Sequence, residues 1–107
     1  MLVLAIETAT PQTSVAIGTE QGVIASASLS WARGHGEVLV PAIERLQAWS
    51  EVRLAQVGGV AVGIGPGLFT GLRVGVSTAR ALAHVLGVAV VGIGSLDVLA
   101  FGVRHTR

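Results

Sequence analysis

The sequence contains no cysteine, no lysine and no tyrosine, and only 12% of its 107 residues are charged. Without cysteine the chain has no disulfide, no thiolate zinc site and no thiol nucleophile. Without lysine it lacks the phosphate-binding lysine of a Walker loop and any Schiff-base chemistry. All seven basic residues are arginines, the net charge is +1, and no run of arginines forms a nucleic-acid-binding stripe.

Apolar residues make up 51% of the chain, which favours some apolar surface being covered by a partner or by further chain. Residues 54–72 form an uncharged run of nineteen, but six glycines and a proline within it fit a strand and a loop better than a membrane helix. No basic region precedes the apolar residues 2–6, as it would in a signal peptide. A cytoplasmic protein with no membrane contact is therefore expected.

Short apolar runs bounded by turn residues predict strands at residues 2–6, 14–18, 23–30, 57–64 and 88–93. Apolar residues three and four positions apart predict helices at 38–49 and 70–86. Ser95 is expected to cap the N-terminus of a third helix. Pro41 is tolerated only in a first turn, so the first helix is expected to begin near Val38 or to be kinked. The order β-β-β-α-β-α-β-α predicts an α/β domain over residues 1–102, with a mixed five-stranded sheet flanked by helices, as in actin-like and ribonuclease-H-like proteins.

The predicted helix at 70–86 carries two glycines four residues apart, Gly71 and Gly75, with Thr78 on the same side. Glycine weakens a helix interior unless its missing side chain serves a purpose. Close approach by another backbone is the expected purpose. A second side of this helix is polar, with Arg73, Ser77, Arg80 and His84.

Glu7 ends the first predicted strand just before a hydroxyl-rich turn that contains Thr8 and Thr10. An actin-like ATPase keeps an acidic residue for metal and phosphate at this place. Two interpretations remain: contact with a nucleotide phosphate, or an acid that accepts hydrogen bonds from the turn. Ala9 replaces the glycine that lets a phosphate approach such a hairpin, which favours the second interpretation.

The glycine turn with Gly65 and Gly67 leads into a helix N-terminus, where free N–H groups could hold an anion. It has no Walker lysine, and Thr70 stands where a dinucleotide fingerprint needs glycine, so a structural turn is favoured over a phosphate cradle. The three histidines are far apart in the sequence and form no His-x-x-x-His pair. No catalytic residue and no metal site are predicted.

Three segments resemble the bacterial TsaB (YeaZ) family: Ala5-Ile6-Glu7-Thr8-Ala9-Thr10, the stretch from His35-Gly36-Glu37 to Pro41, and above all the motif from Gly65 to Gly75. The resemblance implies a role in making threonylcarbamoyladenosine in tRNA. In that family TsaB is a non-catalytic partner of TsaD. TsaD carries the metal and transfers the threonylcarbamoyl group, while TsaE supplies an ATPase. The resemblance also implies indirect contact with tRNA only, and no cofactor apart from ATP or ADP at the interface of the complex.

In this family the two long helices pack against TsaD, or against a second copy when TsaB is alone as a homodimer. The interface residues that this implies here are Leu39, Ile43, Leu46, Gly71, Val74, Gly75, Thr78 and Leu82. The resemblance covers residues 1 to about 102, with residues 103–107 as a tail, and implies a second, similar domain after them. The sequence is therefore interpreted as an N-terminal half.

Two other functions are open alternatives. A nucleotide-binding fragment of an actin-like phosphotransferase would have aspartate in place of Glu7 and glycine in the first hairpin. A glycoprotease-like metallopeptidase would need metal ligands that this sequence does not offer.

Overall fold

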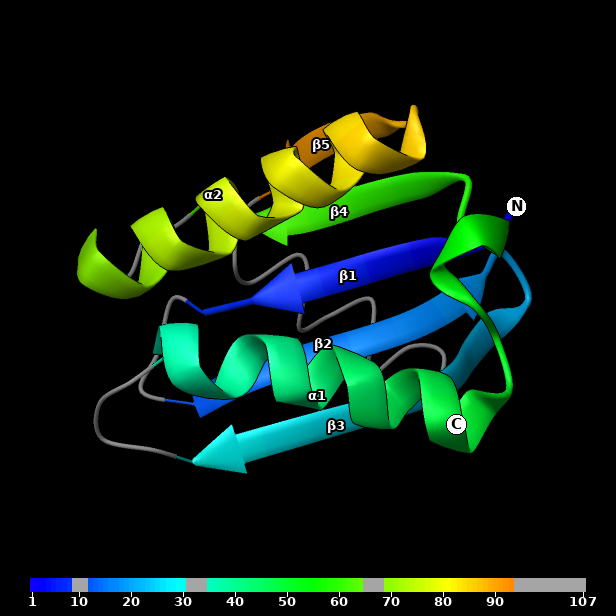
Figure 1. The fold of residues 1–107 in the computed structure, drawn as a ribbon, viewed down its shortest axis with the longest axis horizontal. Coiled ribbons are helices and arrows are strands. Elements are labelled where there is room, and N and C mark those ends of the chain that lie inside the picture. The colour runs from blue at the N-terminus through cyan, green and yellow to red at the C-terminus, as the bar shows by residue number, and fades with distance from the viewer. Residues whose placement is uncertain (9–11, 31–34, 65–68, 94–107) are drawn as a thin grey trace.

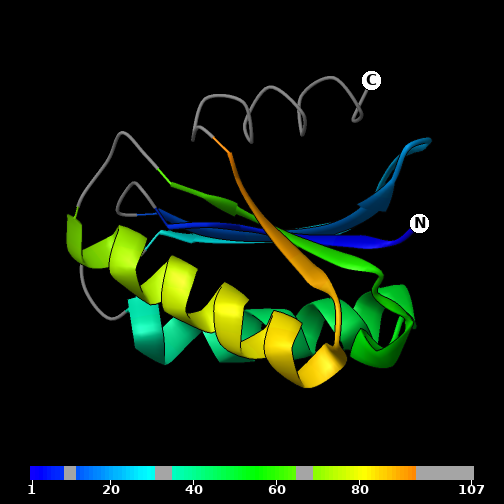
Figure 2. The same cartoon turned by 90° about the horizontal axis from the view of Figure 1, so that it is seen from above.

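The computed structural model describes residues 1–8, 12–30, 35–64 and 69–93, which form one five-stranded sheet with two helices on one of its faces (Figures 1 and 2). The strands lie in the order β3-β2-β1-β4-β5. In chain order the elements are β1 (Val3–Glu7), β2 (Gln12–Thr19), β3 (Gly22–Ser30), α1 (His35–Ser50), the short 3-10 helix η1 (Leu54–Gln56), β4 (Gly59–Gly63), α2 (Phe69–Leu86) and β5 (Ala89–Ile93). The fold class predicted from the sequence is confirmed for this part of the chain. The helix expected after Ser95 lies outside the described residues.

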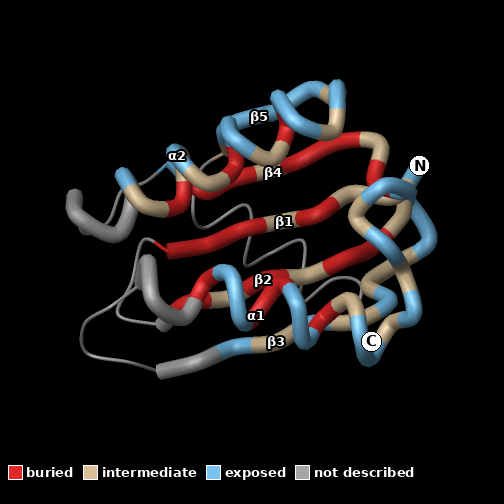
Figure 3. The backbone as a smooth tube through the Cα atoms, in the orientation of Figure 1, coloured by how far each residue is buried: buried red, intermediate tan, exposed pale blue. Residues whose placement is uncertain are grey.

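Strand β1 is the centre of the sheet and the only described strand with an antiparallel neighbour on one side and a parallel neighbour on the other. Leu4 lies opposite Ile17 of β2 and Val60 of β4. Ile6 lies opposite Val15 of β2 and Val62 of β4. Because side chains alternate along a strand, these residues all point to the face that the helices cover. Figure 3 shows burial concentrated along β1, β2 and β4, while β3 and β5 form the more exposed edges.

The core lies between this face and the inner sides of the two helices. Burial of apolar side chains there is the main source of stability, at roughly 25 cal/mol per Å² of apolar surface. The buried apolar residues are Leu4, Ile6, Val15, Ile17, Leu39, Ala42, Ile43, Leu46, Val57, Val60, Val62, Ala79 and Ala83. Burial alternates along β3: Ala25 and Ala27 are half-buried, while Ile24, Ser26 and Ser28 are exposed.

Helix α1 begins at His35, three residues before the predicted start near Val38. Pro41 therefore lies inside the helix, where it has no N–H to donate and one backbone hydrogen bond is lost. Its ring lies on the exposed side of α1, away from the sheet. Packing of the inner side of α1 against the sheet outweighs this local cost. No helix in the described ranges is long and apolar enough to cross a membrane.

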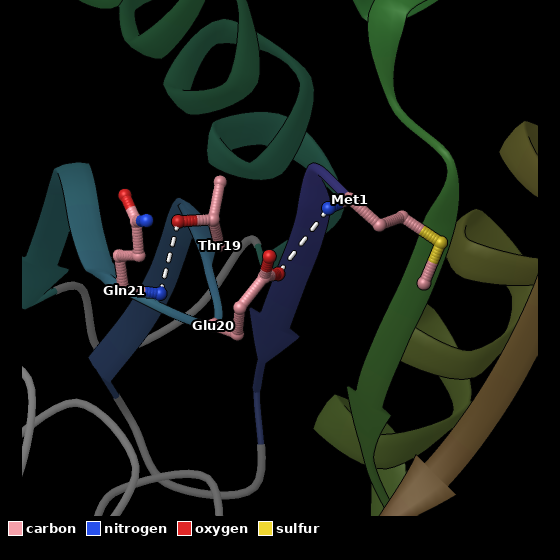
Figure 4. Close-up of polar contacts among 4 residues, drawn as sticks. All are labelled: Met1, Thr19, Glu20 and Gln21. Carbon is pink, nitrogen blue, oxygen red and sulfur yellow. Dashed lines mark hydrogen bonds and ion pairs between the residues drawn. The ribbon is translucent and has the colours of Figure 1, made fainter.

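The amino end of β1 is tied to the turn between β2 and β3 (Figure 4). The ammonium group of Met1 lies 3.2 Å from Oε2 of Glu20, and the Gln21 N–H donates to Thr19 Oγ1 at 3.1 Å within the turn. The pKa of Glu20 is lowered by a backbone hydrogen bond and, in addition, by the hydrogen bond and charge of the Met1 ammonium. Both side chains are largely exposed, at 65% and 76%, so solvent screens this ion pair.

We expect Glu20→Gln to lower the melting temperature slightly at neutral pH. Because the pKa of Glu20 is lowered in the folded chain, its ionised form stabilises the fold above the ordinary carboxyl pKa. That contribution is lost as the pH falls through the lowered pKa. The difference between variant and wild type should therefore vanish in strong acid, as measured by thermal melts at both pH values. Glu44→Gln, at an exposed position on α1, is the control, and a difference that persists in acid would contradict the assignment.

Candidate functional site

The carboxyl ends of β1 and β4 lie next to one another because the two strands are parallel and in register. β1 ends at Glu7 and β4 ends at Gly63, and Thr8 follows directly after β1. In open α/β sheets, ligands bind beyond the carboxyl ends of parallel strands. The sheet therefore places Glu7 and Thr8, two of the predicted phosphate contacts, where such a ligand would lie.

The Glu7 carboxylate fills the space above Gly63. Glu7 is only 3% exposed, and a Cβ atom on Gly63 would lie 2.8 Å from the Glu7 carboxyl carbon and collide with Oε2. Any residue other than glycine at position 63 would have to push the buried carboxylate away. The glycine at the end of β4 is thus needed for Glu7 to lie where it does.

Thr8 makes the corresponding contact with helix α2. Its side chain is fully buried, and a Cβ atom on Gly75 would collide with Thr8 Oγ1. The close approach expected at Gly75 is therefore present, but it is made by a side chain of this chain and not by another backbone. Gly75 is occupied by the internal packing of the domain, so a larger residue there would disturb the fold before it disturbed a partner.

The environment of Glu7 and Thr8 favours a structural role over contact with a phosphate. Both side chains are buried, both lie against a glycine, and both have further interactions within the chain. A carboxylate in this position can stabilise the strand end and orient the following turn. Thr10, Gly65 and Gly67 lie outside the described residues, so phosphate contact through them stays a prediction.

The predicted interface residues of α1 face inward. Leu39, Ile43 and Leu46 are 1%, 3% and 0% exposed, because α1 packs this side against the sheet of its own chain. On α2, Gly75 is buried and Val74, Thr78 and Leu82 are half-buried, while the surroundings of Gly71 are not described. A partner that docks on α1 would therefore meet a different set of side chains there, while partner contact through Val74, Thr78 and Leu82 of α2 stays a prediction.

The two helices expose several large apolar side chains to solvent. Val40 and Trp49 of α1 are 53% and 63% exposed, and Val85 of α2 is 81% exposed. The guanidinium carbon of Arg45 lies 5.7 Å from the centre of the Trp49 ring, a cation–π geometry. The three-and-four spacing places Trp49 on the same side of α1 as Leu39, Ile43 and Leu46, so its exposure differs from what the pattern predicts. Val40 falls outside that side.

A recess of about 420 Å³ opens on α2, lined by Arg73, Val74, Ser77 and Thr78. Its lining mixes one cation, two hydroxyl groups and one apolar side chain. Within the described ranges no three His, Asp or Glu residues come together in a way that could hold a metal ion.

The mixed sheet with strand order β3-β2-β1-β4-β5 and two helices on one face defines the class: an actin-like, ribonuclease-H-like domain. The sequence pattern of the family described as TsaD, tRNA N6-adenosine threonylcarbamoyltransferase, matches residues 16–107. Among solved structures, YeaZ from Pseudomonas aeruginosa superposes with a TM-score of 0.85 at 33% identity, over 92% of this chain and 46% of that one. The chain belongs to the TsaD family, and over most of its length it is similar to TsaB (YeaZ) proteins.

Two curated relatives are similar to this chain. The tRNA threonylcarbamoyladenosine biosynthesis protein TsaB of Escherichia coli is 34% identical over 95% of this chain and 44% of its own length. An uncharacterized protein of Mycobacterium leprae is 42% identical over 98% of this chain and 30% of its own length. The chain thus spans less than half the length of these relatives.

We expect Gly63→Ala to destabilise the chain by about 1–3 kcal/mol, the usual cost of inserting atoms into a packed site. The added methyl group would have to displace the buried Glu7 carboxylate. Gly59→Ala is the matched control: it lies on the same face of the same strand, and its Cβ would meet nothing closer than the Met1 methyl carbon at 3.8 Å. The control should be neutral or stabilising by up to about 1 kcal/mol.

Urea unfolding of both variants measures these differences, and a double-mutant cycle tests the assigned contact. In a Glu7→Ala background the collision partner is gone, so Gly63→Ala should cost less than it does in the wild type. Equal costs in the two backgrounds would show that Gly63 is required for another reason.

Proposed function

We propose that this chain is the actin-like domain of a TsaB-type subunit that acts in making threonylcarbamoyladenosine in tRNA. Its role in that proposal is to bind a TsaD-type transferase, without carrying out the transfer itself. The names of its relatives, TsaB in Escherichia coli and the TsaD family description, support the pathway. Because the chain spans less than half of these relatives, the activity and the partners of the whole protein are part of the proposal.

One observation carries the binding role: large apolar side chains are exposed on both helices. Val40, Trp49 and Val85 are large apolar side chains that lie more than half exposed on α1 and α2. Tryptophan and arginine are the residue types that most often dominate the binding energy of protein interfaces. The stacked pair of Arg45 and Trp49 is therefore a candidate anchor for a partner.

The environment of Glu7 supports the non-catalytic part of the proposal. A catalytic acid must reach its substrate, whereas the Glu7 carboxylate is buried over Gly63. Thr8, the next residue, is likewise packed against Gly75. In this interpretation the strand ends that bind ligands in other actin-like proteins are used here to hold β1, β4 and α2 together.

The remaining partners follow from the same assignment. A TsaE homologue would join the complex of this subunit and the transferase, and ATP or ADP would bind only at an interface between subunits. When the subunit is alone, a second copy would take the place of the transferase on the helices and form a homodimer. Contact with tRNA would be made by the transferase, in the cytoplasm.

We expect Val40→Arg to weaken binding to the TsaD-type transferase of the same source at least about tenfold, because it places a charge in the apolar contact. Ile24→Arg is the matched control: Ile24 is 50% exposed, close to the 53% of Val40, but it lies on the face of the sheet opposite the helices. The control should bind like the wild type in sedimentation experiments with the purified transferase.

Each result decides part of the proposal. No complex with wild-type chain would overturn the binding role of this domain. A complex that Ile24→Arg weakens and Val40→Arg leaves intact would move the interface to the other face of the sheet.

A further inference from the structure

Strand β5 lies at one edge of the sheet, with β4 as its only neighbour among the described strands. Its residues Ala89–Ile93 are all uncharged, and all but the last are exposed (Figure 3). Val90 and Val91 are 38% and 55% exposed and point to opposite faces of the sheet. A strand edge of this kind offers its outward backbone groups to another strand.

The two edges of the described sheet differ in how they are protected. Natural sheets protect edge strands with charged residues, proline, bulges or short length. The edge strand β3 has exposed serines at positions 26 and 28, and the register between β2 and β3 shifts between Ile17 and Gly18. β5 pairs with β4 in unbroken register and contains no charge and no proline. Its short length is therefore its only protection.

The backbone groups that β5 turns outward follow from one hydrogen bond. The Ile64 N–H donates to the Ile93 carbonyl at 2.8 Å, so the backbone groups of Ile93 face β4. Successive residues along a strand turn these groups to opposite sides. The N–H and C=O groups of Val90 and Gly92 therefore face away from β4, where no described strand pairs with them.

A second copy of β5 matches these outward groups. In an antiparallel pair centred on Val91, Val90 of each copy lies opposite Gly92 of the other, and the two residues exchange both backbone hydrogen bonds. All the outward groups are then paired. The two Val91 side chains meet on one face, and on the other face each Val90 lies beside a glycine that leaves it room. No like charges meet, because β5 has none.

We propose that β5 pairs with β5 of a second copy of this chain, antiparallel and centred on Val91. The contact is two-fold, because the same residues serve on both sides, and it joins two sheets into one through backbone hydrogen bonds. β5 has 5 residues, far fewer than the roughly 20–30 residues a side of a stable interface. The pair is therefore weak, and its population depends on the concentration of the chain.

This contact is separate from the one proposed on the helices. Helix α1, which carries Val40 and Trp49, packs on β2 and β3, and α2 packs mainly on β4 (Figure 1). A β5 pair therefore leaves the exposed residues of α1 free. Two chains joined through β5 can each hold a transferase, and they pair whether or not a transferase binds.

Disulfide cross-linking tests the pair and its register, because the chain has no cysteine of its own. In a pair centred on Val91, the two Cα atoms of residue 91 lie about 4.5 Å apart, within the range that a disulfide spans. We expect Val91→Cys to form a covalent dimer in a glutathione redox buffer. Ala89→Cys is the matched control, exposed on the same face of the same strand. Its two copies would lie about 13 Å apart, too far for a bridge.

A second control is Ile24→Cys, at a residue 50% exposed on the opposite edge strand. Val91→Cys should give at least about tenfold more covalent dimer than either control, because pairing raises the effective concentration of the two thiols. Equal amounts from the three variants would show random collision and overturn the pairing. More dimer from Ala89→Cys than from Val91→Cys would overturn the pairing about Val91.

Sedimentation equilibrium tests the pair without cross-linking. In the Val40→Arg background, which weakens contact through the helices, the chain should still form a dimer as its concentration rises. Adding Val91→Lys should abolish that dimer, since two ammonium groups would meet at its centre. Adding Ile24→Lys should leave it unchanged. A Val40→Arg chain that stays monomeric, or a dimer that Val91→Lys leaves intact, would overturn the β5 pair. Thermal melts show whether each variant is folded.

Discussion

The structure depends on the close fit between the carboxyl end of β1 and two glycines. Glu7 lies over Gly63 of β4, and Thr8 lies against Gly75 of α2. These contacts join the central strand to its parallel neighbour and to the helix above them. Both side chains are buried at the carboxyl end of β1.

This arrangement separates the two sides of the helical layer. The inner sides of α1 and α2 are committed to the core, with Leu46 and Ala79 fully buried against the sheet. Val40 and Trp49 of α1 and Val85 of α2 are exposed to solvent. Exposed apolar side chains on a rigid layer suit recognition of another protein, since little ordering is needed on binding.

The strands and helices could be predicted because their signals are local. The apolar run of β4, the alternation along β3 and the three-and-four spacing of α2 each occupy a single stretch of sequence. The partner of Gly75 could not be predicted, since Thr8 is distant in the sequence. Leu39, Ile43 and Leu46 were assigned to an interface from the family resemblance, which indicates the helix but not which of its sides a partner covers. The start of α1 was placed too late because Pro41 was given more weight than tertiary packing.

The central claim is that the outer side of the helices, and not the opposite face of the sheet, contacts the transferase. Methyl cross-saturation by NMR tests it without any substitution, using methyl-labelled chain and unlabelled, purified TsaD-type transferase. We expect the methyl signals of Val40 and Val85 to lose intensity on binding, and those of Ile24 and Val91 on the sheet to keep theirs. Loss of intensity at Ile24 and Val91, with Val40 and Val85 unchanged, would contradict the account.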